Sequence, residues 1–213
     1  MTYTSSQATP KTQQGESLSK TSKPLPGDLA IWFFILAELA VFSIFFVAYA
    51  FVRLNNLEMF EEGFQHLNRT AGVINTLALI TSSYFVVRAV MEIHNGKDQS
   101  CSRWLNWALV CGAVYVVVKL WEYSETLDAG FSIHTNTFYM FYFFLTFFHF
   151  AHVLLGMVVL AIISFKVRQG AYRGDQEKGI EDESIAVVES GASYWHMIDL
   201  LWIILFPLVY VLH

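Results

Sequence analysis

Five long apolar runs dominate this sequence and leave little choice of fold. In a chain of 213 residues they lie at about 29–52, 71–90, 104–123, 137–165 and 193–212. An α-helix rises about 1.5 Å per residue, so about 20 apolar residues cross the hydrocarbon layer of a bilayer. Charged residues make up only 15% of the chain, against about 25% in soluble domains. The sequence therefore predicts an all-α polytopic membrane protein, folded as a bundle of five transmembrane helices.

The first residues differ in composition from the rest of the chain. Residues 1–26 are rich in Ser, Thr, Gln, Lys and Pro and show no apolar periodicity, which predicts a disordered cytoplasmic tail ahead of a transmembrane domain at 27–213. The tail contains no hydrophobic segment, so it does not resemble a secretory signal peptide. The net charge of −5 argues against a nucleic-acid partner, which would need a basic surface.

The positions of Lys and Arg predict the orientation in the membrane. Cytoplasmic segments near transmembrane helices carry an excess of these residues. They are concentrated in the tail and in the second and fourth connections, while the first connection has two and the third has none. The sequence thus predicts an N-terminus inside and a C-terminus outside. The residues that carry the argument are Lys11, Lys20, Lys23, Arg88, Lys97, Arg103, Lys166, Arg168, Arg173 and Lys178, against Arg53 and Arg69.

Glu38 is the only charged residue in the first apolar run. An ionised side chain near the middle of a bilayer costs on the order of 2.5–3.5 kcal/mol or more unless it is neutralised, paired or hydrated. Helical spacing places Glu38 on a strip with the aromatic residues Phe34 and Phe42, where the neutral acid is expected. Candidate partners are His149, His152 and a lipid headgroup, and the sequence leaves all three open.

The other four runs also carry polar residues on one helical face. Residues three, four or seven apart share a face, and polar faces in a membrane bundle turn inward, where they find partners. We therefore expect the polar faces to converge, with the second run in close contact with a neighbour and the two charges of the third run either paired or directed to the interface. The residues are Asn75 and Ser82 in the second run, Lys119 and Glu122 in the third, His149 and His152 in the fourth, and His196 and Asp199 in the fifth.

Two of these sets permit a sharper interpretation. His149 and His152 could bind a metal with Glu38 or Asp199 as a third ligand, although bundle metal sites usually contain additional Glu-x-x-His pairs, and a hydrogen-bonded structural pair is favoured. His196 and Asp199 could be a proton-relay pair, which with Glu38 could serve a small proton-coupled membrane transporter. The favoured alternative is a structural pair, in which the carboxylate fixes the histidine against the neighbouring helix. The sequence has no glycine-rich phosphate loop and no nucleophile elbow. From the residues alone, it predicts a bundle with neither a metal nor a cofactor of its own.

Several motifs, in order along the chain, resemble subunit III of the haem-copper oxidases. Phe148–Gly156 resembles the F-H-x-x-H-V-x-x-G helix of that family, and Glu189–Trp202 resembles its E-x-G-x-x-Y-W-H-x-x-D-x-x-W ending. Asn75-Thr76 followed by Ser82-Ser83, the segment Lys119–Tyr123, and Glu38 followed by Phe42 resemble three further family motifs. Each match is modest, and their combination and order make the resemblance specific.

The resemblance implies a non-catalytic subunit of a respiratory oxidase in a bacterial inner membrane. Such a subunit packs against the catalytic subunit, stabilises it, supports proton uptake and holds a phospholipid in a cleft, while haem and copper reside in the partner subunits. It implies that Glu38 is the carbodiimide-reactive carboxylate near that cleft. The intrabundle polar residues, with no bond-making role, would be Glu122, His149, His152, His196 and Asp199.

The resemblance leaves the branch of the family open. Longer members have seven spans, whereas the quinol oxidase branch and the nitric-oxide-reductase-associated branch have five. The segment Leu25–Asp28 before the first run is more similar to the nitric-oxide-reductase-associated branch. The partner is therefore expected to be an oxidase or a nitric oxide reductase, fed by cytochrome c, quinol or nitric oxide.

Overall fold

A computed structural model describes residues 29–169 and 180–211 of the chain, with the backbone alone for 180–184. Every described secondary-structure element is helical, and five helices are long and apolar enough to cross a membrane. The all-α, five-span prediction is therefore confirmed. The predicted tail, residues 1–26, lies outside the described residues. The elements are α1 (Leu29–Asn55), α2 (Leu57–Gln65), α3 (Arg69–His94), α4 (Asp98–Asp128), α5 (Thr137–Arg168), α6 (Ile180–Phe206) and a π-helical turn, η2 (Pro207–Val211).

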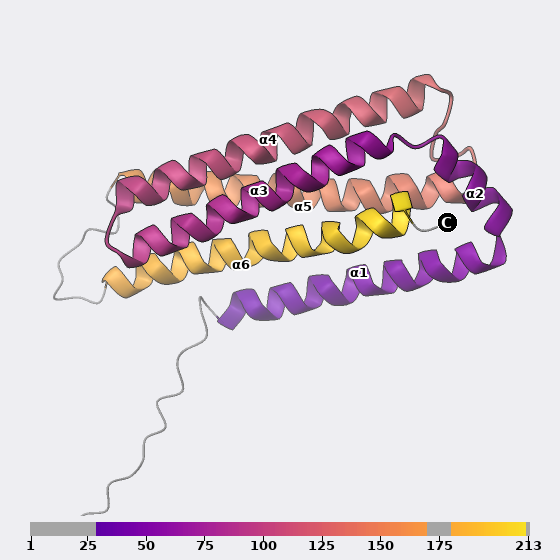
Figure 1. Cartoon of the computed structure of the whole chain (residues 1–213). Helices are drawn as coiled ribbons and strands as arrows, with labels where there is room; N and C mark the ends of the chain where they lie inside the picture. The colour runs from indigo at the N-terminus through magenta and orange to yellow at the C-terminus, as the bar shows by residue number, and fades with distance from the viewer. Residues whose placement is uncertain (1–28, 170–179, 212–213) are drawn as a thin grey trace, which may run out of the picture.

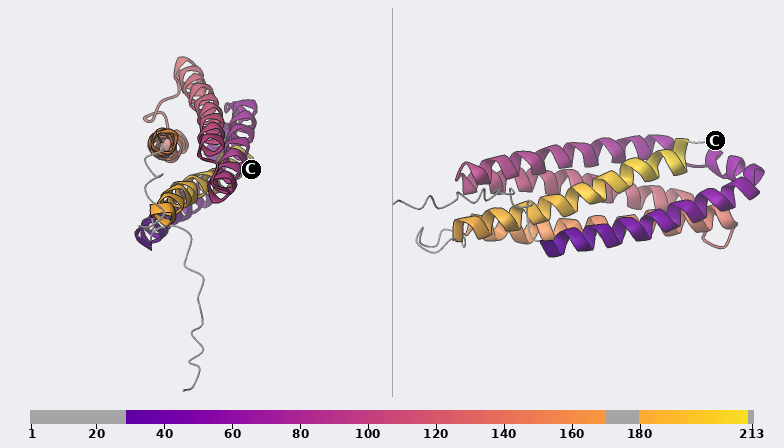
Figure 2. Two further views of the ribbon diagram at one scale, coloured as in Figure 1. Left: turned by 90° about the vertical axis from the view of Figure 1, so that its left-hand side faces the viewer. Right: turned by 90° about the horizontal axis from the view of Figure 1, so that it is seen from below.

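The five long helices lie side by side and alternate in direction (Figures 1 and 2). The short helix α2 lies at one end of the bundle, which we call the α2 end. Helices α1, α4 and α6 finish at this end, and α3 and α5 begin there. Because consecutive helices are antiparallel, residues early in α5 lie at the same depth as residues late in α4 and α6. This relationship brings residues of α4, α5 and η2 together in the buried ionic cluster described below.

The helices extend beyond the apolar runs that identified them. Helix α4 covers Asp98–Asp128 rather than 104–123, and α6 begins at Ile180 rather than near 193. Apolar runs mark only the hydrocarbon layer, whereas helical hydrogen bonding continues into the polar interface. Helix α2 was not predicted, because its nine residues are too few for a span. It is amphipathic, with Phe60 and Phe64 buried.

Side-chain caps and a tight turn set the helix ends. Asn68 caps α3 by accepting a hydrogen bond from the Ala71 N–H, and Asn136 does the same for α5. Gly96, in the short connection between α3 and α4, has φ of 67°, a conformation that glycine adopts without a steric penalty. The connection makes α3 and α4 antiparallel neighbours. Across their contact, Ser82 Oγ donates to the Ala108 carbonyl at 2.9 Å, so Ser82 lies between the two helices.

Helix α1 is the least embedded of the five spans. Its buried residues are Ile35, Phe42 and Tyr49, one on every second turn. The Phe42 ring lies 5.1 Å from the ring of Phe148 and 5.5 Å from that of His152, so aromatic contacts attach α1 to α5. The opposite side of α1 is exposed and apolar, as the surface of a transmembrane helix should be.

The two ends of the bundle differ in their content of Lys and Arg. Two of these residues lie at the α2 end and five lie towards the opposite end, whereas acidic residues occur at both ends. At the α2 end lie Glu58, Glu61, Glu62, Glu125 and Asp128, with Arg53 and Arg69, while Arg88, Lys97, Arg103, Lys166 and Arg168 lie towards the opposite end.

Candidate functional site

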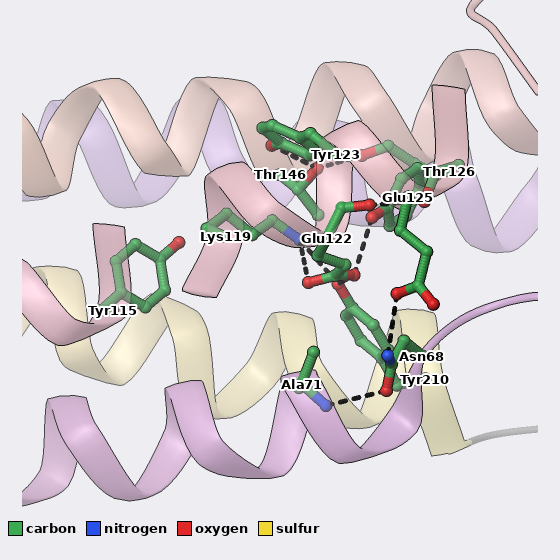
Figure 3. A network of polar contacts seen from close by, with 12 residues as sticks. Asn68, Ala71, Tyr115, Lys119, Glu122, Tyr123, Glu125, Thr126, Thr146 and Tyr210 are labelled. Carbon is green, nitrogen blue, oxygen red and sulfur yellow. Dashed lines mark hydrogen bonds and ion pairs between the residues drawn. The ribbon is translucent and has the colours of Figure 1, made fainter. Parts of the chain in front are cut away.

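A fully buried ionic cluster joins three helices in the half of the bundle nearer the α2 end (Figure 3). Lys119 and Glu122 of α4 form an ion pair of 3.1 Å, and each residue is 0% exposed. The Tyr142 hydroxyl, from α5, donates to Glu122 Oε1 at 2.7 Å. The Tyr210 hydroxyl, from η2, accepts from Lys119 Nζ at 2.7 Å and donates to Glu122 Oε1 at 2.6 Å. The sequence prediction that Lys119 and Glu122 could pair is confirmed.

Aromatic rings surround the ammonium group of this cluster. Lys119 Nζ lies 4.9 Å from the ring centroid of Tyr123, 5.1 Å from that of Tyr142, 5.4 Å from that of Tyr210 and 5.6 Å from that of Trp202. The negative faces of aromatic rings attract a cation, and the attraction strengthens where water is excluded. The rings therefore replace part of the hydration that the lysine loses on burial.

The local sequence explains how Tyr210 reaches the cluster. Pro207 has no backbone N–H and its ring crowds the preceding turn, so the regular α-helical pattern cannot continue through it. The chain widens into the π-helical turn Pro207–Val211. Trp202 anchors the helix just before this turn, since its Nε1 donates to Thr76 Oγ1 of α3 at 2.9 Å.

Glu38 pairs with His152 across the contact between α1 and α5, at 3.1 Å between Oε2 and Nε2. His152 Nδ1 lies 2.7 Å from the Phe148 carbonyl oxygen, which can only accept, so Nδ1 carries a proton. The remaining nitrogen either donates to a carboxylate or accepts from a carboxylic acid. In both cases one proton lies between Glu38 and His152. Of the two histidines among the candidate partners, His152 is the one that contacts Glu38.

His149 takes a different set of partners from His152, although it lies only one turn away. Its Nε2 is 3.1 Å from the Ile198 carbonyl oxygen and must donate, so Nδ1 of the neutral ring accepts from the Tyr115 hydroxyl at 3.1 Å. Both ring nitrogens are engaged, and the side chain is completely buried. The two histidines therefore do not converge on a common ligand position, and among the described residues no group of three His, Cys, Asp or Glu side chains could hold a metal.

His196 and Asp199 of α6 meet α3 at a shared hydroxyl. His196 Nδ1 lies 2.9 Å from Ser83 Oγ, and the Asp199 carboxyl also contacts the Ser83 hydroxyl. Asp199 Oδ1 and both amide atoms of Asn75 are buried without a protein hydrogen-bond partner. This polar set lies between α3 and α6, whereas Glu38 lies between α1 and α5. The residues assigned to the transporter alternative thus occupy two separate helix contacts.

An apolar groove opens between α1, α5 and α6 in the half of the bundle away from the α2 end. It encloses about 890 Å³ and includes Phe34, Val159, Ile162 and Tyr194 in its lining. Ring contacts between Phe34 and Tyr194, with centroids 5.8 Å apart, connect α1 to α6 along this groove. A groove of this size and composition can accommodate a hydrocarbon chain.

Sequence reasoning did not identify Tyr142 and Tyr210 as partners of Glu122. It also missed Ser83 as the group that His196 and Asp199 share. A comparison of depth would have identified the tyrosines, because consecutive spans alternate in direction. Tyr142 lies in the second turn of α5, Glu122 lies late in α4, and Tyr210 lies in η2 after α6, so the three residues are at a similar depth.

Known proteins match this chain along most of its length. The family described as cytochrome c oxidase subunit III matches residues 9–213. "Cytochrome c oxidase subunit 3" of Thermostichus vulcanus is 30% identical over 185 residues, which cover 86% of each chain. "Cytochrome bo(3) ubiquinol oxidase subunit 3" of Pseudomonas putida is 23% identical and covers 86% of this chain and 84% of its own length. "Heme-copper oxidase subunit I+III" of Aeropyrum pernix is 28% identical over 88% of this chain and 23% of its own length. The chain belongs to the cytochrome c oxidase subunit III family.

Proposed function

We propose that this chain is the non-catalytic subunit III of a respiratory haem-copper oxidase and packs against the catalytic subunit. The observation that carries the proposal is the match to the Aeropyrum pernix protein named subunit I+III. A region similar to nearly all of this chain is joined there to a subunit I in one polypeptide. Two chains replaced by one fused chain are expected to be neighbours in the assembly.

The internal polar contacts support an accessory role rather than catalysis. Lys119 and Glu122 neutralise each other in a sealed cluster, and both nitrogens of His149 are engaged. A catalytic residue needs access to a substrate, and these groups have none. Glu38 and His152 are partly exposed at the edge of the bundle, where a shared proton could support proton uptake by the partner. Haem and copper are then bound by the partner subunits.

The groove between α1, α5 and α6 supports the proposal of a structural phospholipid. Leu155, Val159 and Ile162 form one stripe of α5 along the groove, and Lys166 continues the same stripe at the interface. An acyl chain in the groove would place its phosphate beside this exposed ammonium group. Replacing Val159 by Trp would fill the groove, whereas Val158→Trp would add the same bulk on the exposed side of α5.

Native mass spectrometry of the purified complex tests the lipid proposal. We expect phospholipid to be retained by the wild type and by Val158→Trp and lost from Val159→Trp. Equal retention by both variants would place the lipid elsewhere.

We further propose that the α2 end faces the outside and the opposite end faces the cytoplasm of a bacterium, in its inner membrane. The larger number of Lys and Arg residues at the opposite end supports this orientation. A cysteine introduced at exposed Glu61 should react with an impermeant maleimide added outside intact spheroplasts. Reaction only after lysis would reverse the orientation.

Purification under mild detergent tests the main proposal. We expect a haem-bearing chain to co-purify, seen by its visible absorption and by mass spectrometry, whereas recovery of this chain alone would overturn the proposal. Assays of the purified complex with reduced cytochrome c, quinol and nitric oxide then distinguish the partner, including the nitric-oxide-reductase alternative. The alternative of a proton-coupled transporter is not favoured. If liposomes that contain the purified wild-type chain show no proton-driven flux, this alternative is excluded.

A further inference from the structure

We infer that the C-terminal turn η2 is a latch that closes the buried ion pair of α4, so that α4 becomes firmly seated only when α6 has docked. This inference does not depend on the proposed function, since it concerns contacts within the chain. The word "seated" here means that the polar face of α4, with Lys119 and Glu122, is packed inside the bundle.

Helix α4 cannot satisfy its own charges. Lys119 and Glu122 reach each other at 3.1 Å on one face of the helix. A carboxylate offers about four acceptor sites and an ammonium group three donors, so one mutual contact leaves most of them unused. Outside the bundle these groups would have to stay near water at the interface, which long side chains close to a helix end can reach. The fully packed state of α4 therefore needs donors and acceptors from other helices.

Tyr210 supplies the group that bonds both charges. Its hydroxyl oxygen accepts from Lys119, and its hydroxyl proton goes to Glu122 (Figure 3). Tyr142 of α5 donates a hydrogen bond to the Glu122 carboxylate and makes none to Lys119. Helix α5 therefore provides a partner for the carboxylate only, whereas η2 provides a partner for both the carboxylate and the ammonium group.

The latch is itself held in place by α3. At Gly72, an added Cβ would lie 2.8 Å from Phe206 Cε2 and 3.3 Å from Tyr210 Cδ1, so the absence of a side chain lets the turn pack closely. Phe206 and Tyr210 stack with centroids 5.6 Å apart. The packing of α6 and η2 on α3 therefore helps to define the position of Tyr210 beside the ion pair.

The chain offers a matched control for the latch. Tyr139 is also buried, but its hydroxyl has no protein hydrogen-bond partner. Tyr139→Phe and Tyr210→Phe remove the same atom from the same residue type at the same end of the bundle. A native thiol reports on α4, since Cys101 is 0% exposed on its buried face. Cys111→Ala removes the second thiol of the chain from the assay.

Maleimide labelling of Cys101 in native membranes, with the full chain and its natural partners, tests the inference. Losing a hydrogen bond to charged groups should speed labelling about tenfold or more in Tyr210→Phe, while Tyr139→Phe stays at the wild-type rate. In the Lys119→Met/Glu122→Gln background, adding Tyr210→Phe should have no further effect, because no charges remain to be closed. The latch is overturned if Tyr210→Phe labels like Tyr139→Phe, or if its effect persists in full without the ion pair. If the double replacement does not accumulate, the comparison of the two tyrosines still decides the question.

Discussion

Glu38 Oε2 and His152 Nε2 lie 3.1 Å apart with one proton between them. The Phe148 carbonyl fixes the other His152 nitrogen as a donor, so the pair is either a carboxylic acid with a neutral imidazole or a carboxylate with an imidazolium. Both forms carry no net charge, which is what a low-dielectric setting favours. The membrane cost of Glu38 is therefore removed by a single partner on the neighbouring helix.

Hydrophobic carbodiimides should modify Glu38, because these reagents need a protonated carboxyl group in an apolar setting. We expect labelling of the wild type at Glu38, measured by peptide mass spectrometry, and no labelling at this position in Glu38→Gln. His152→Phe removes the base that shares the proton, leaves the neutral acid as the favoured form and should increase labelling. Exclusive modification of Glu61, an exposed carboxylate on α2, would contradict the burial argument.

Metal analysis should find no stoichiometric iron, copper or zinc in this chain once it is separated from its partners. His149 uses both ring nitrogens for Tyr115 and Ile198, and His152 uses both for Phe148 and Glu38. To bind one nitrogen from each histidine, a metal ion would have to break one existing hydrogen bond at His149 and one at His152. One equivalent of metal that is lost in His149→Phe would restore the metalloenzyme hypothesis.

Gly156→Ala should weaken the contact between α5 and α6. A Cβ at this position would lie 2.7 Å from Ile198 Cδ1 and 3.0 Å from Trp195 Cε3. Added bulk in a packed core typically costs about 1–3 kcal/mol, and here it also disturbs the residue whose carbonyl holds His149. The midpoint of thermal unfolding in detergent should fall. Ala151→Val is the control, since it enlarges a residue on the exposed side of α5 and should leave the midpoint unchanged.

Asn68→Ala should destabilise the α2 end in two ways. The Asn68 side chain caps α3, and its Nδ2 donates to Glu125 Oε2 of α4 at 2.9 Å. Losing the cap costs about 0.5–2 kcal/mol. Asn68→Ser keeps a capping oxygen but cannot reach Glu125, so its unfolding midpoint should lie between those of the wild type and Asn68→Ala. Similar midpoints for all three proteins would mean that neither contact matters.

The sequence predicted the helices and the direction of their faces well, because both depend on local spacing. On α5, His149 is buried as expected, and Phe147 on the other side of the helix is exposed. The pair Lys119 and Glu122 was visible for the same reason, since the two residues are neighbours on one helix. Length and apolar content likewise separated the five spans.

Contacts between distant helices could not be predicted from such spacing. Glu38 had three candidate partners because periodicity gives the face of a helix but neither its neighbour nor its depth. The joining of Tyr210 to Glu122 depends on the π-helical turn after Pro207, which shifts the tyrosine relative to a regular helix. Ser83 was overlooked because a serine in an apolar helix usually bonds its own backbone, whereas this one bonds His196.

The aromatic enclosure of Lys119 also has a consequence for inheritance. The lysine, its carboxylate and the surrounding rings come from α4, α5, α6 and η2, and a lone charge left in this dry interior would be costly. A relative that has replaced Lys119 is expected to have replaced Glu122 as well, and selection would then no longer retain the hydroxyl groups of Tyr142 and Tyr210. These four positions should therefore covary among related sequences, although they are far apart in the chain.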